Sequence, residues 1–239
     1  MINSIYLNKT GMIIQQRRLD VSTNNLANIN TVGYKKDGVF FHKLAEALAD
    51  TGEADANRLP GSSNVDFSLG TMQRTDNPLD VAINGEGFFV IQGEDGEYFS
   101  RNGSFQLDGE GRLVTIDGHS VVTDGGEIQI AGGEVRFNEK GEIIVDGQSV
   151  GRLRIATFED PQQLERIGDA YFKAGTAGAT DLPNEEIDLR AGYLELSNVD
   201  PVMEMVNMIE INREYELGQK VINTQDNTLD KLINQTGRP

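Results

Sequence analysis

The chain has 239 residues and a net charge of −17, from 38 Asp and Glu against 21 Lys and Arg. This acidic balance excludes the basic footprint that nucleic-acid binding requires, and the absence of cysteine excludes disulfides, zinc–thiolate sites and thiol nucleophiles. No stretch approaches the roughly 20 apolar residues of a membrane span, so no membrane insertion is expected, and residues 1–10 lack the basic and apolar regions of a cleavable secretory signal.

The first predicted element is a long helix over residues 5–29, within an N-terminal helical segment 1–33. Apolar residues recur in it at seven-residue intervals, in two series: Ile5, Met12, Leu19 and Leu26, and Leu7, Ile14 and Val21. The two series point roughly 200° apart on a helix, so this helix needs partners on two sides. Asn28 and Gly33 predict where it ends, because both residue types adopt the left-handed conformation that closes a helix.

Residues 34–78 are predicted to form an extended connector, because their second half is polar and interrupted by Pro60, Gly61 and Pro78. A β-rich domain follows over residues 79–190. Asp-Gly and Asn-Gly pairs recur there and suit tight hairpin turns, while runs such as Val135 and Phe137 around Arg136 alternate with period two. These patterns predict antiparallel strands with one buried face and a solvated acidic surface.

The last segment, residues 191–239, is predicted as a return segment and a C-terminal helix. Asp200 is a suitable N-cap, and Pro201 suits the first helical position. From there to residue 234 the helix would span roughly 51 Å, so it needs a partner along its length, and the N-terminal helix is the obvious one. Its heptad positions are Met208, Ile211, Tyr215, Gly218, Ile222, Leu229 and Leu232. Gly218 in this series predicts close approach of a neighbouring backbone.

The predicted fold class is therefore α+β: long N- and C-terminal helices form a coiled-coil-like domain, and a mainly antiparallel β domain lies between them in sequence. The heptad residues of both helices, from Ile5 to Leu26 and from Met208 to Leu232, are the candidate assembly interface. Helices that carry more apolar surface than one partner covers indicate a protein that joins its neighbours.

No catalytic, cofactor-binding or metal-binding residues are expected. His42 and His119 lie far apart in sequence without a ligand pattern, and Gly85 and Gly87 lack the third glycine of a dinucleotide fingerprint. Two other classes stay open from the residues alone. A secreted carbohydrate-acting enzyme would need two carboxylates at hydrolase separation within residues 79–190. A self-contained binding module would not need residues 1–30.

Three segments carry motifs that resemble those of one family. The first motif has the pattern N-L-A-N-x-x-T-x-G-[YF]-[KR] and is formed by Asn25, Leu26, Ala27, Asn28, Thr31, Gly33, Tyr34 and Lys35. Residues 80–89 and 101–105 are similar to D-[VL]-A-I-x-G-x-G-F-F and R-x-G-x-F, and residues 192–199 are similar to G-x-L-E-x-S-N-V, ending in Ser197, Asn198 and Val199. In this order the motifs resemble those of the bacterial flagellar rod and hook family of axial proteins.

The resemblance implies a non-enzymatic structural subunit of the flagellar basal-body rod, which polymerises with itself and other rod proteins through its terminal helices and transmits torque. It also implies an outward-facing β domain and export through the flagellar type III apparatus without a cleavable signal peptide. Phe40 and Leu44 resemble the Phe-x-x-x-apolar element that exported subunits present to the export gate, although a buried hydrophobic pair would have the same spacing. Within this family, the resemblance favours the proximal-rod type over the distal-rod type, because it implies a longer insertion after the first helix for the distal-rod type.

Overall fold

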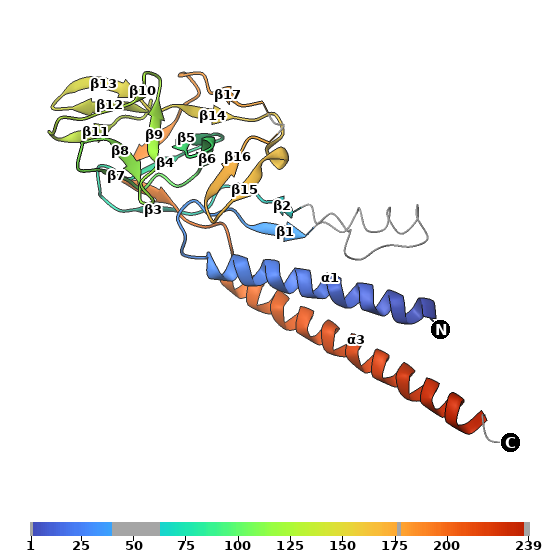
Figure 1. The fold of residues 1–239 in the computed structure, drawn as a ribbon. Coiled ribbons are helices and arrows are strands. Elements are labelled where there is room, and N and C mark those ends of the chain that lie inside the picture. Colours follow the sequence, from blue (N-terminus) through green and yellow to red (C-terminus); the bar gives the residue numbers. More distant parts are fainter. Residues whose placement is uncertain (1, 40–62, 176–177, 237–239) are drawn as a thin grey trace. The chain divides into compact units, whose positions relative to one another are not determined.

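The computed structural model describes residues 2–39, 63–175 and 178–236. The chain divides into two compact units. The helical unit comprises Met1–Ala27, Asp37–Val65 and Asp200–Pro239, and the β unit comprises Asn28–Lys36 and Asp66–Val199. The fold class is α+β, with two terminal helices and a central antiparallel β region (Figure 1). Within the described ranges, no helix is both long enough and apolar enough to cross a membrane.

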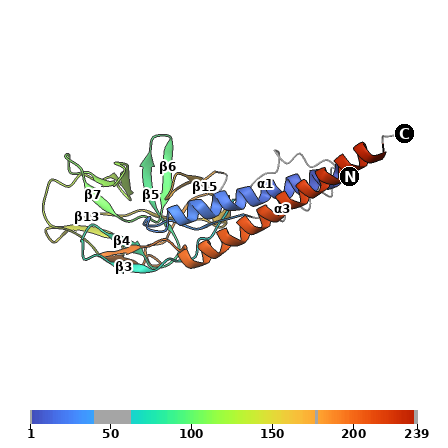
Figure 2. The same ribbon diagram turned by 90° about the horizontal axis from the view of Figure 1, so that it is seen from below.

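The helical unit is built on two helices, α1 (Ile2–Ala27) and α3 (Pro201–Thr236), which lie side by side in both ribbon views (Figures 1 and 2). It also contains the short antiparallel pair β1 (Asp37–Val39) and β2 (Ser63–Val65). The predicted start of the last helix is confirmed.

The N-cap of α3 is Asp200, whose Oδ1 accepts the backbone N–H groups of Val202 at 2.8 Å and Met203 at 3.1 Å. Because these donors have no partner inside the helix, the cap satisfies groups that the first turn leaves open. Pro201 occupies the first helical position, where its missing N–H costs nothing.

The largest sheet of the β unit has ten antiparallel strands, with β15, β16, β6, β5, β9, β8 and β7 as neighbours in that order. Strand β10 pairs with β9, β14 pairs with β5, and β17 pairs with β14. The bounds are β5 (Phe88–Gly93), β6 (Gly96–Ser100), β7 (Phe105–Leu107), β8 (Leu113–Thr115), β9 (Ser120–Thr123), β10 (Gly126–Glu127), β14 (Ile155–Thr157), β15 (Glu165–Ile167), β16 (Tyr171–Lys173) and β17 (Thr180–Asp181).

Three smaller sheets complete the β unit. One is a three-stranded meander of β11 (Val135–Phe137), β12 (Glu142–Val145) and β13 (Gln148–Arg152), with β13 outermost in Figure 1. The other two are antiparallel pairs: β4 (Val81–Ile83) with β18 (Leu189–Ala191), and β3 (Met72–Arg74) with β19 (Tyr193–Glu195). The last pair brings residues expected in the connector against the segment that precedes α3.

The core of the β unit explains where the predicted alternation holds and where it does not. In β11, Val135 and Phe137 are buried and Arg136 between them is exposed, as expected for a strand with one buried face. In β5, however, every residue except Gln92 is buried. This strand lies inside the largest sheet and is covered on both faces, so its sequence is a continuous apolar run rather than an alternating one.

Two hairpin turns, residues 108–112 and 138–142, have the same construction. In each, the Oδ1 atom of the first residue accepts the backbone N–H groups two and four residues further on, at 2.9 Å for both bonds of Asp108 and at 3.0 and 2.9 Å for Asn138. The glycine at the fourth position has a φ of 78° in one turn and 77° in the other. Side chains that bond their own backbone in this way stabilise turns locally, so both turns are encoded by nearby residues.

The segment before β15 begins with a short helical turn. A single 3-10 turn, η2 (Pro161–Gln163), follows Asp160, whose side chain accepts the N–H of Gln162. The chain then returns to an extended conformation at Leu164 and enters β15. Pairing of β15 with β16 supplies backbone hydrogen bonds that a longer helix would otherwise have provided.

Candidate assembly site

Polar contacts set the register between α1 and α3 in the helical unit. Ser22 Oγ donates to Glu204 Oε2 at 2.5 Å, and both side chains are buried. Farther along, Glu214 Oε2 accepts from Gln15 at 2.6 Å and from Arg18 at 3.1 Å. A buried polar pair is satisfied in only one helix register, so these contacts oppose sliding of α3 along α1.

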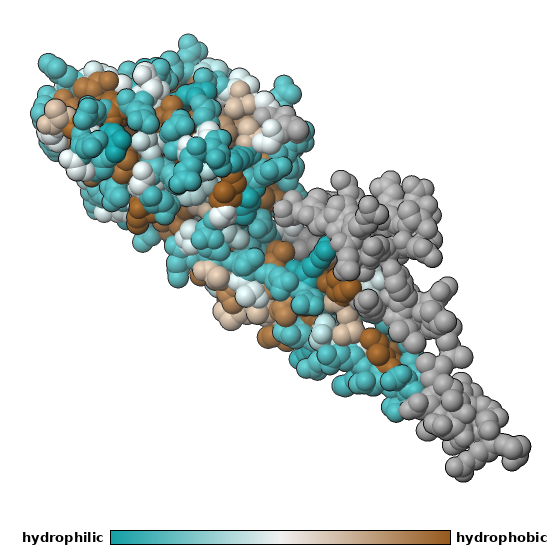
Figure 3. Space-filling model, in the orientation of Figure 1, coloured by the Kyte–Doolittle hydropathy of each residue, from teal (hydrophilic) through white to brown (hydrophobic). Residues whose placement is uncertain are grey.

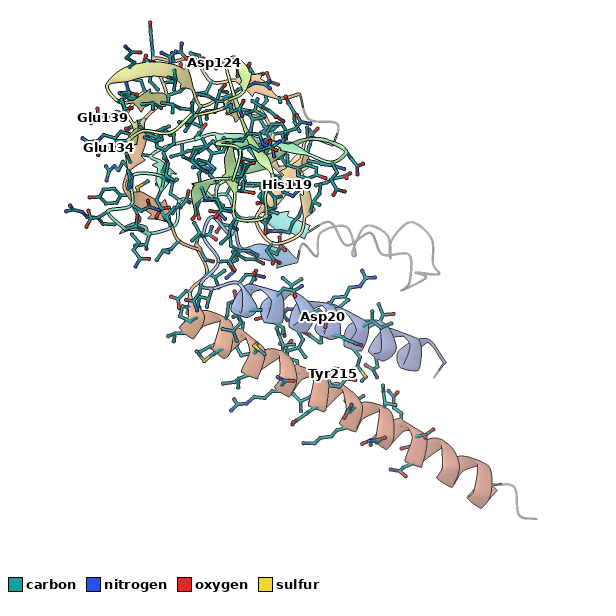
Figure 4. All side chains as sticks on the ribbon, turned by 60° about the vertical axis from the view of Figure 1, so that its left-hand side comes forward. Asp20, His119, Asp124, Glu134, Glu139 and Tyr215 are labelled. Atoms are coloured by element: carbon teal, nitrogen blue, oxygen red, sulfur yellow. The ribbon has the colours of Figure 1, made fainter. Side chains whose placement is uncertain are left out.

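The predicted heptad residues of α3 lie mostly on the side that faces α1. Ile211 is 3% exposed, and Met208, Tyr215, Gly218 and Ile222 are half-buried (Tyr215 is labelled in Figure 4). A Cβ atom added to Gly218 would lie 3.2 Å from Cγ of Met12. The close neighbour of Gly218 is therefore the Met12 side chain of α1 in the same chain, whereas the sequence predicted a neighbouring backbone.

The N-terminal heptad residues are described in part. Met12, Leu19 and Leu26 are half-buried on α1, whereas Asp20 on the same helix is exposed (Figure 4). The backbones of Ile5, Leu229 and Leu232 are helical, but their side chains lie outside the described part of the structure. Whether these positions form an interface between subunits stays a prediction.

The opposite side of α3 carries a row of exposed apolar side chains that the sequence reasoning did not single out. Apolar atoms are visible among the polar surface of the helical unit (Figure 3). At about 3.6 residues per turn, these residues point away from the side that holds Ile211. We call this row the outer stripe; its members are Val202 (64% exposed), Met205 (49%), Val206 (43%), Ile209 (54%) and Leu217 (60%). An apolar row of this length is larger than the scattered apolar residues normal for a monomer surface, and it indicates a contact surface.

In the first family-like motif, side-chain hydrogen bonds hold the C-terminal end of α1 and the turn that follows it. Asn25 is 1% exposed; its Nδ2 donates to the carbonyl of Asp37 at 2.8 Å, and its Oδ1 accepts the N–H of Asp37 at 2.9 Å. Thr31 Oγ1 donates to Asn28 Oδ1 at 3.0 Å, within the turn that follows the helix. A side-chain amide is well suited to Asn25's position, because it donates and accepts in one plane as a neighbouring strand would.

Gly33 allows the motif to approach the R-x-G-x-F segment. Its φ is 70°, and an added Cβ atom would lie 2.4 Å from the backbone N of Asn102 and 2.5 Å from the carbonyl carbon of Arg101. Its N–H donates to the carbonyl of Glu195 at 2.8 Å. The position thus requires both a left-handed conformation and the absence of a side chain, and only glycine meets both conditions.

One charged residue from each of the three motifs belongs to a buried ion network, which comprises Lys35, Arg101 and Glu195. Lys35 Nζ lies 2.6 Å from Glu195 Oε1, and Arg101 lies 3.5 Å from Glu195 Oε2. The exposed fractions of the three side chains are 1% for Lys35, 4% for Arg101 and 1% for Glu195. Lys35 also donates to the carbonyl of Ser68 at 2.7 Å, and Glu195 Oε1 accepts the N–H of Gly70 at 2.9 Å.

Burial and charge act against each other in this network. Burial lowers the pKa of the Lys35 ammonium below its ordinary value, and the Glu195 carboxylate opposes that shift. Burial likewise lowers the pKa of the Arg101 guanidinium, again against the effect of Glu195. One carboxylate therefore stabilises two desolvated cations, and its loss would leave both without their counter-ion.

The C-terminal motif is tied to the N-terminal motif by Asn198. Its Oδ1 accepts the N–H of Lys36 at 2.7 Å, and its Nδ2 donates to the carbonyls of Asp66 at 2.8 Å and Ser68 at 3.1 Å. Ser197 Oγ accepts the N–H of Val199, which is itself buried. These bonds hold the segment that directly follows α1 in sequence against the segment that directly precedes α3.

The structure thus brings together the motif residues Gly33, Tyr34 and Asn198 with three charged residues that were not predicted as site residues. Arg166 stacks over the ring of Tyr34 at 4.6 Å and donates to the carbonyl of Lys35. The signal in the sequence was the occurrence of Lys35, Arg101 and Glu195 inside otherwise apolar or glycine-rich motifs. Phe40 and Leu44, the possible export element, lie outside the described residues.

The described residues contain no cluster of three or more His, Asp or Glu that could hold a metal ion. His119 lies apart from the labelled carboxylates Asp124, Glu134 and Glu139 in Figure 4, and its ring packs edge-on against Tyr98 and Tyr171. The second histidine, His42, is outside the described ranges.

Models of three related protein families match this chain over separate segments. Residues 5–35 match the flagella basal body rod protein, residues 82–145 match the flagellar hook protein FlgE/F/G D1 domain, and residues 190–235 match the flagellar basal body rod FlgEFG protein C-terminal region. Each matched segment contains one residue of the buried ion network: Lys35, Arg101 and Glu195 in that order.

Characterised relatives are similar over nearly the whole chain. The flagellar basal-body rod protein FlgG of Buchnera aphidicola is 35% identical over 258 residues, covering 97% of this chain and 99% of the relative. FlgG of Bacillus subtilis is 35% identical over 261 residues, covering 98% and 99%. The flagellar basal-body rod protein FlgF of Caulobacter vibrioides is 33% identical over 244 residues, covering 96% and 95%.

Proposed function

This chain belongs to the bacterial flagellar rod and hook family and is a structural subunit of the basal-body rod, and we propose that it joins its neighbours through its helical unit. The observation that carries this proposal is the outer stripe on α3. One side of α3 packs against α1 of the same chain, and the opposite side leaves five large apolar residues exposed. A helix with two apolar sides needs a second partner, and in a polymer that partner is a helix of a neighbouring subunit.

Two long helices that pack side by side suit the transmission of torque. A twisting load is shared among all contacts along a helix, so no single contact carries it. The register contacts Ser22–Glu204 and Arg18–Glu214 oppose sliding of one helix along the other within the subunit. No step in this proposal requires catalysis, a cofactor or a metal ion, and the carbohydrate-acting enzyme considered above has no support from the relatives.

We expect a carboxylate in the outer stripe to abolish assembly without unfolding the subunit. Val206→Glu or Ile209→Glu should lower the fraction of basal bodies with a complete rod at least about tenfold, because burying an unpaired carboxylate costs several kcal/mol. Both side chains are about half exposed in the isolated subunit, so its melting temperature should change little. Electron microscopy of basal bodies from a complemented deletion strain, together with swimming in soft agar, measures the effect.

The matched control is Gln219→Glu, which adds the same charge at an exposed polar position of the same helix. It should leave rod assembly unchanged. Normal assembly of both stripe variants would rule out the outer stripe as the joining surface.

Within the family, the chain fits the proximal-rod, FlgF-like type, with the distal-rod, FlgG-like type as the alternative. Its alignment with the Caulobacter FlgF spans 244 positions, whereas its alignment with the Buchnera FlgG spans 258 for a similar share of this chain. The FlgG relative therefore has more residues that this chain lacks. Complementation of two strains, one that lacks the proximal-rod subunit and one that lacks the distal-rod subunit, tests this assignment. Rescue of the distal-rod strain alone would reverse it.

Export through the flagellar type III apparatus follows from the same assignment, with Phe40 and Leu44 as the element presented to the export gate. The double change Phe40→Ala and Leu44→Ala should lower the amount of this subunit secreted by a strain that cannot complete its rod, with cellular levels unchanged. Undiminished secretion would leave these residues without an export role.

A further inference from the structure

A cavity of about 730 Å³ opens on the β unit, between the turn that joins β11 to β12 and strand β18. Its lining combines apolar and charged groups. Phe137 and Leu189 belong to the hydrophobic core and form apolar parts of the wall, whereas Glu139, Lys140 and Arg190 are exposed. A volume of this size accommodates several side chains of a partner.

The two basic residues of the cavity differ in their partners. Lys140 Nζ donates to the carbonyls of Glu185 at 2.9 Å and Ile187 at 3.3 Å, so it fastens the turn to the segment before β18. Arg190 is paired in β18 opposite Ala82 of β4, and its side chain is exposed. Among the described residues, Arg190 makes no side-chain hydrogen bond and no ion pair.

This makes Arg190 unusual within the β unit. Each of the other lysines and arginines described in that unit has at least one partner, and most are held by carboxylates. Even the exposed Arg154 is held by two carboxylates, Glu97 and Asp181. In a chain with 38 acidic and 21 basic residues, a carboxylate near every arginine is the expected outcome. Arg190 borders the cavity and is held by no carboxylate among the described residues, so it is available to a carboxylate from another molecule.

Polymerisation supplies such a carboxylate. Identical subunits with a net charge of −17 repel one another unless acidic groups of one copy meet basic groups of the next. We infer that the cavity beside Arg190 is a contact site for a second copy of this chain, and that Arg190 receives an Asp or Glu side chain from the acidic β unit of that copy.

The chemistry of the site fits that occupant. A guanidinium presents paired donors that match the two oxygens of a carboxylate, and it always carries its charge. The apolar wall at Phe137 and Leu189 can cover the methylene groups of an incoming Glu, and Tyr193 adds an aromatic edge. Arginine and tyrosine at the border of a partly apolar recess are typical of residues that dominate interface energies.

This inference rests on the proposed function and is tested in assembled rods. Arg190→Glu places two carboxylates against each other, so the fraction of basal bodies with a complete rod should fall about tenfold or more, whereas Arg190→Lys should retain most assembly. The control Arg136→Glu reverses another exposed charge of the same unit, at a residue that does not line the cavity, and should assemble normally. If Arg190→Glu assembles as well as Arg190→Lys while the stripe variants fail, this inference is overturned and the helical contact stands. If Arg190→Glu and both stripe variants assemble normally, this inference and the proposed helical contact are both overturned.

A second measurement identifies the occupant. The chain has no cysteine, so Ala191→Cys, at the exposed edge of the cavity, gives a single attachment point for a photoreactive maleimide. In basal bodies, illumination should produce a dimer of this chain, and mass spectrometry should place the second attachment within residues 66–199. The absence of any cross-link in assembled rods, or a cross-link only to a different protein or to the helical unit, would contradict the inference.

Discussion

Replacing Glu195 with Gln is expected to lower the free energy of unfolding of the β unit by about 3–5 kcal/mol, because it leaves Lys35 and Arg101 buried without their counter-ion. The substitution preserves the shape of the side chain, so a loss of this size would report charge rather than packing. Urea unfolding followed by far-UV circular dichroism and tyrosine fluorescence measures it, since the chain has no tryptophan.

Two comparisons make this result specific. Lys35→Met should cost less than Glu195→Gln, because Glu195 then keeps Arg101 and the N–H of Gly70. Glu134→Gln breaks an exposed ion pair with Arg136 and should have a much smaller effect. An unchanged urea midpoint for Glu195→Gln would show that the buried ion network does not stabilise the fold.

Replacing Gly33 with Ala is expected to lower the free energy of unfolding by about 2–5 kcal/mol. The left-handed conformation costs about 1–2 kcal/mol for a residue with a Cβ atom, and crowding adds about 1–3 kcal/mol. Crowding is severe here because the atoms that the new Cβ would meet, at 2.4 and 2.5 Å, belong to the backbone of Asn102 and Arg101. Thermal unfolding of the purified chain measures the total.

The matched control is Gly118→Ala. Gly118 has a φ of 86°, close to the 70° of Gly33, but no atom lies within 4 Å of the position that its Cβ would occupy. This variant is destabilised only by the conformational cost. The difference between the two variants in free energy of unfolding therefore isolates the effect of crowding. Equal destabilisation by both would mean that the loop around Asn102 moves aside freely.

Features encoded by a few neighbouring residues were predictable from the sequence. Asp200 and Pro201 marked the start of α3, because an N-cap and the first helical position depend only on adjacent groups. The turn at Asp108 formed for the same reason, since its side chain bonds N–H groups two and four residues away. The central β region and its antiparallel character followed from the spacing of such turns.

The contacts within the candidate site were predictable only in part. The motifs pointed to Asn25, Gly33 and Asn198, and the structure supplies a physical reason for each one. From the sequence, the first helix was expected to need a second partner, because it carries two apolar series. In the structure, the exposed apolar series is instead the outer stripe of α3. Periodicity along one helix does not say which side a second helix will cover, so this assignment required the packed pair.

By itself, the sequence determined the family, the α+β order of elements, the start of the last helix and the turns, because each depends on residues close together in the chain. Only the tertiary structure decided that Lys35, Arg101 and Glu195 form one network, that Gly33 lies against Asn102, and that Arg190 borders a cavity and makes no ion pair among the described residues. The first two facts join residues that are from 66 to 160 positions apart. Their contacts arise from how the strands pair, and strand pairing is a property of the whole fold.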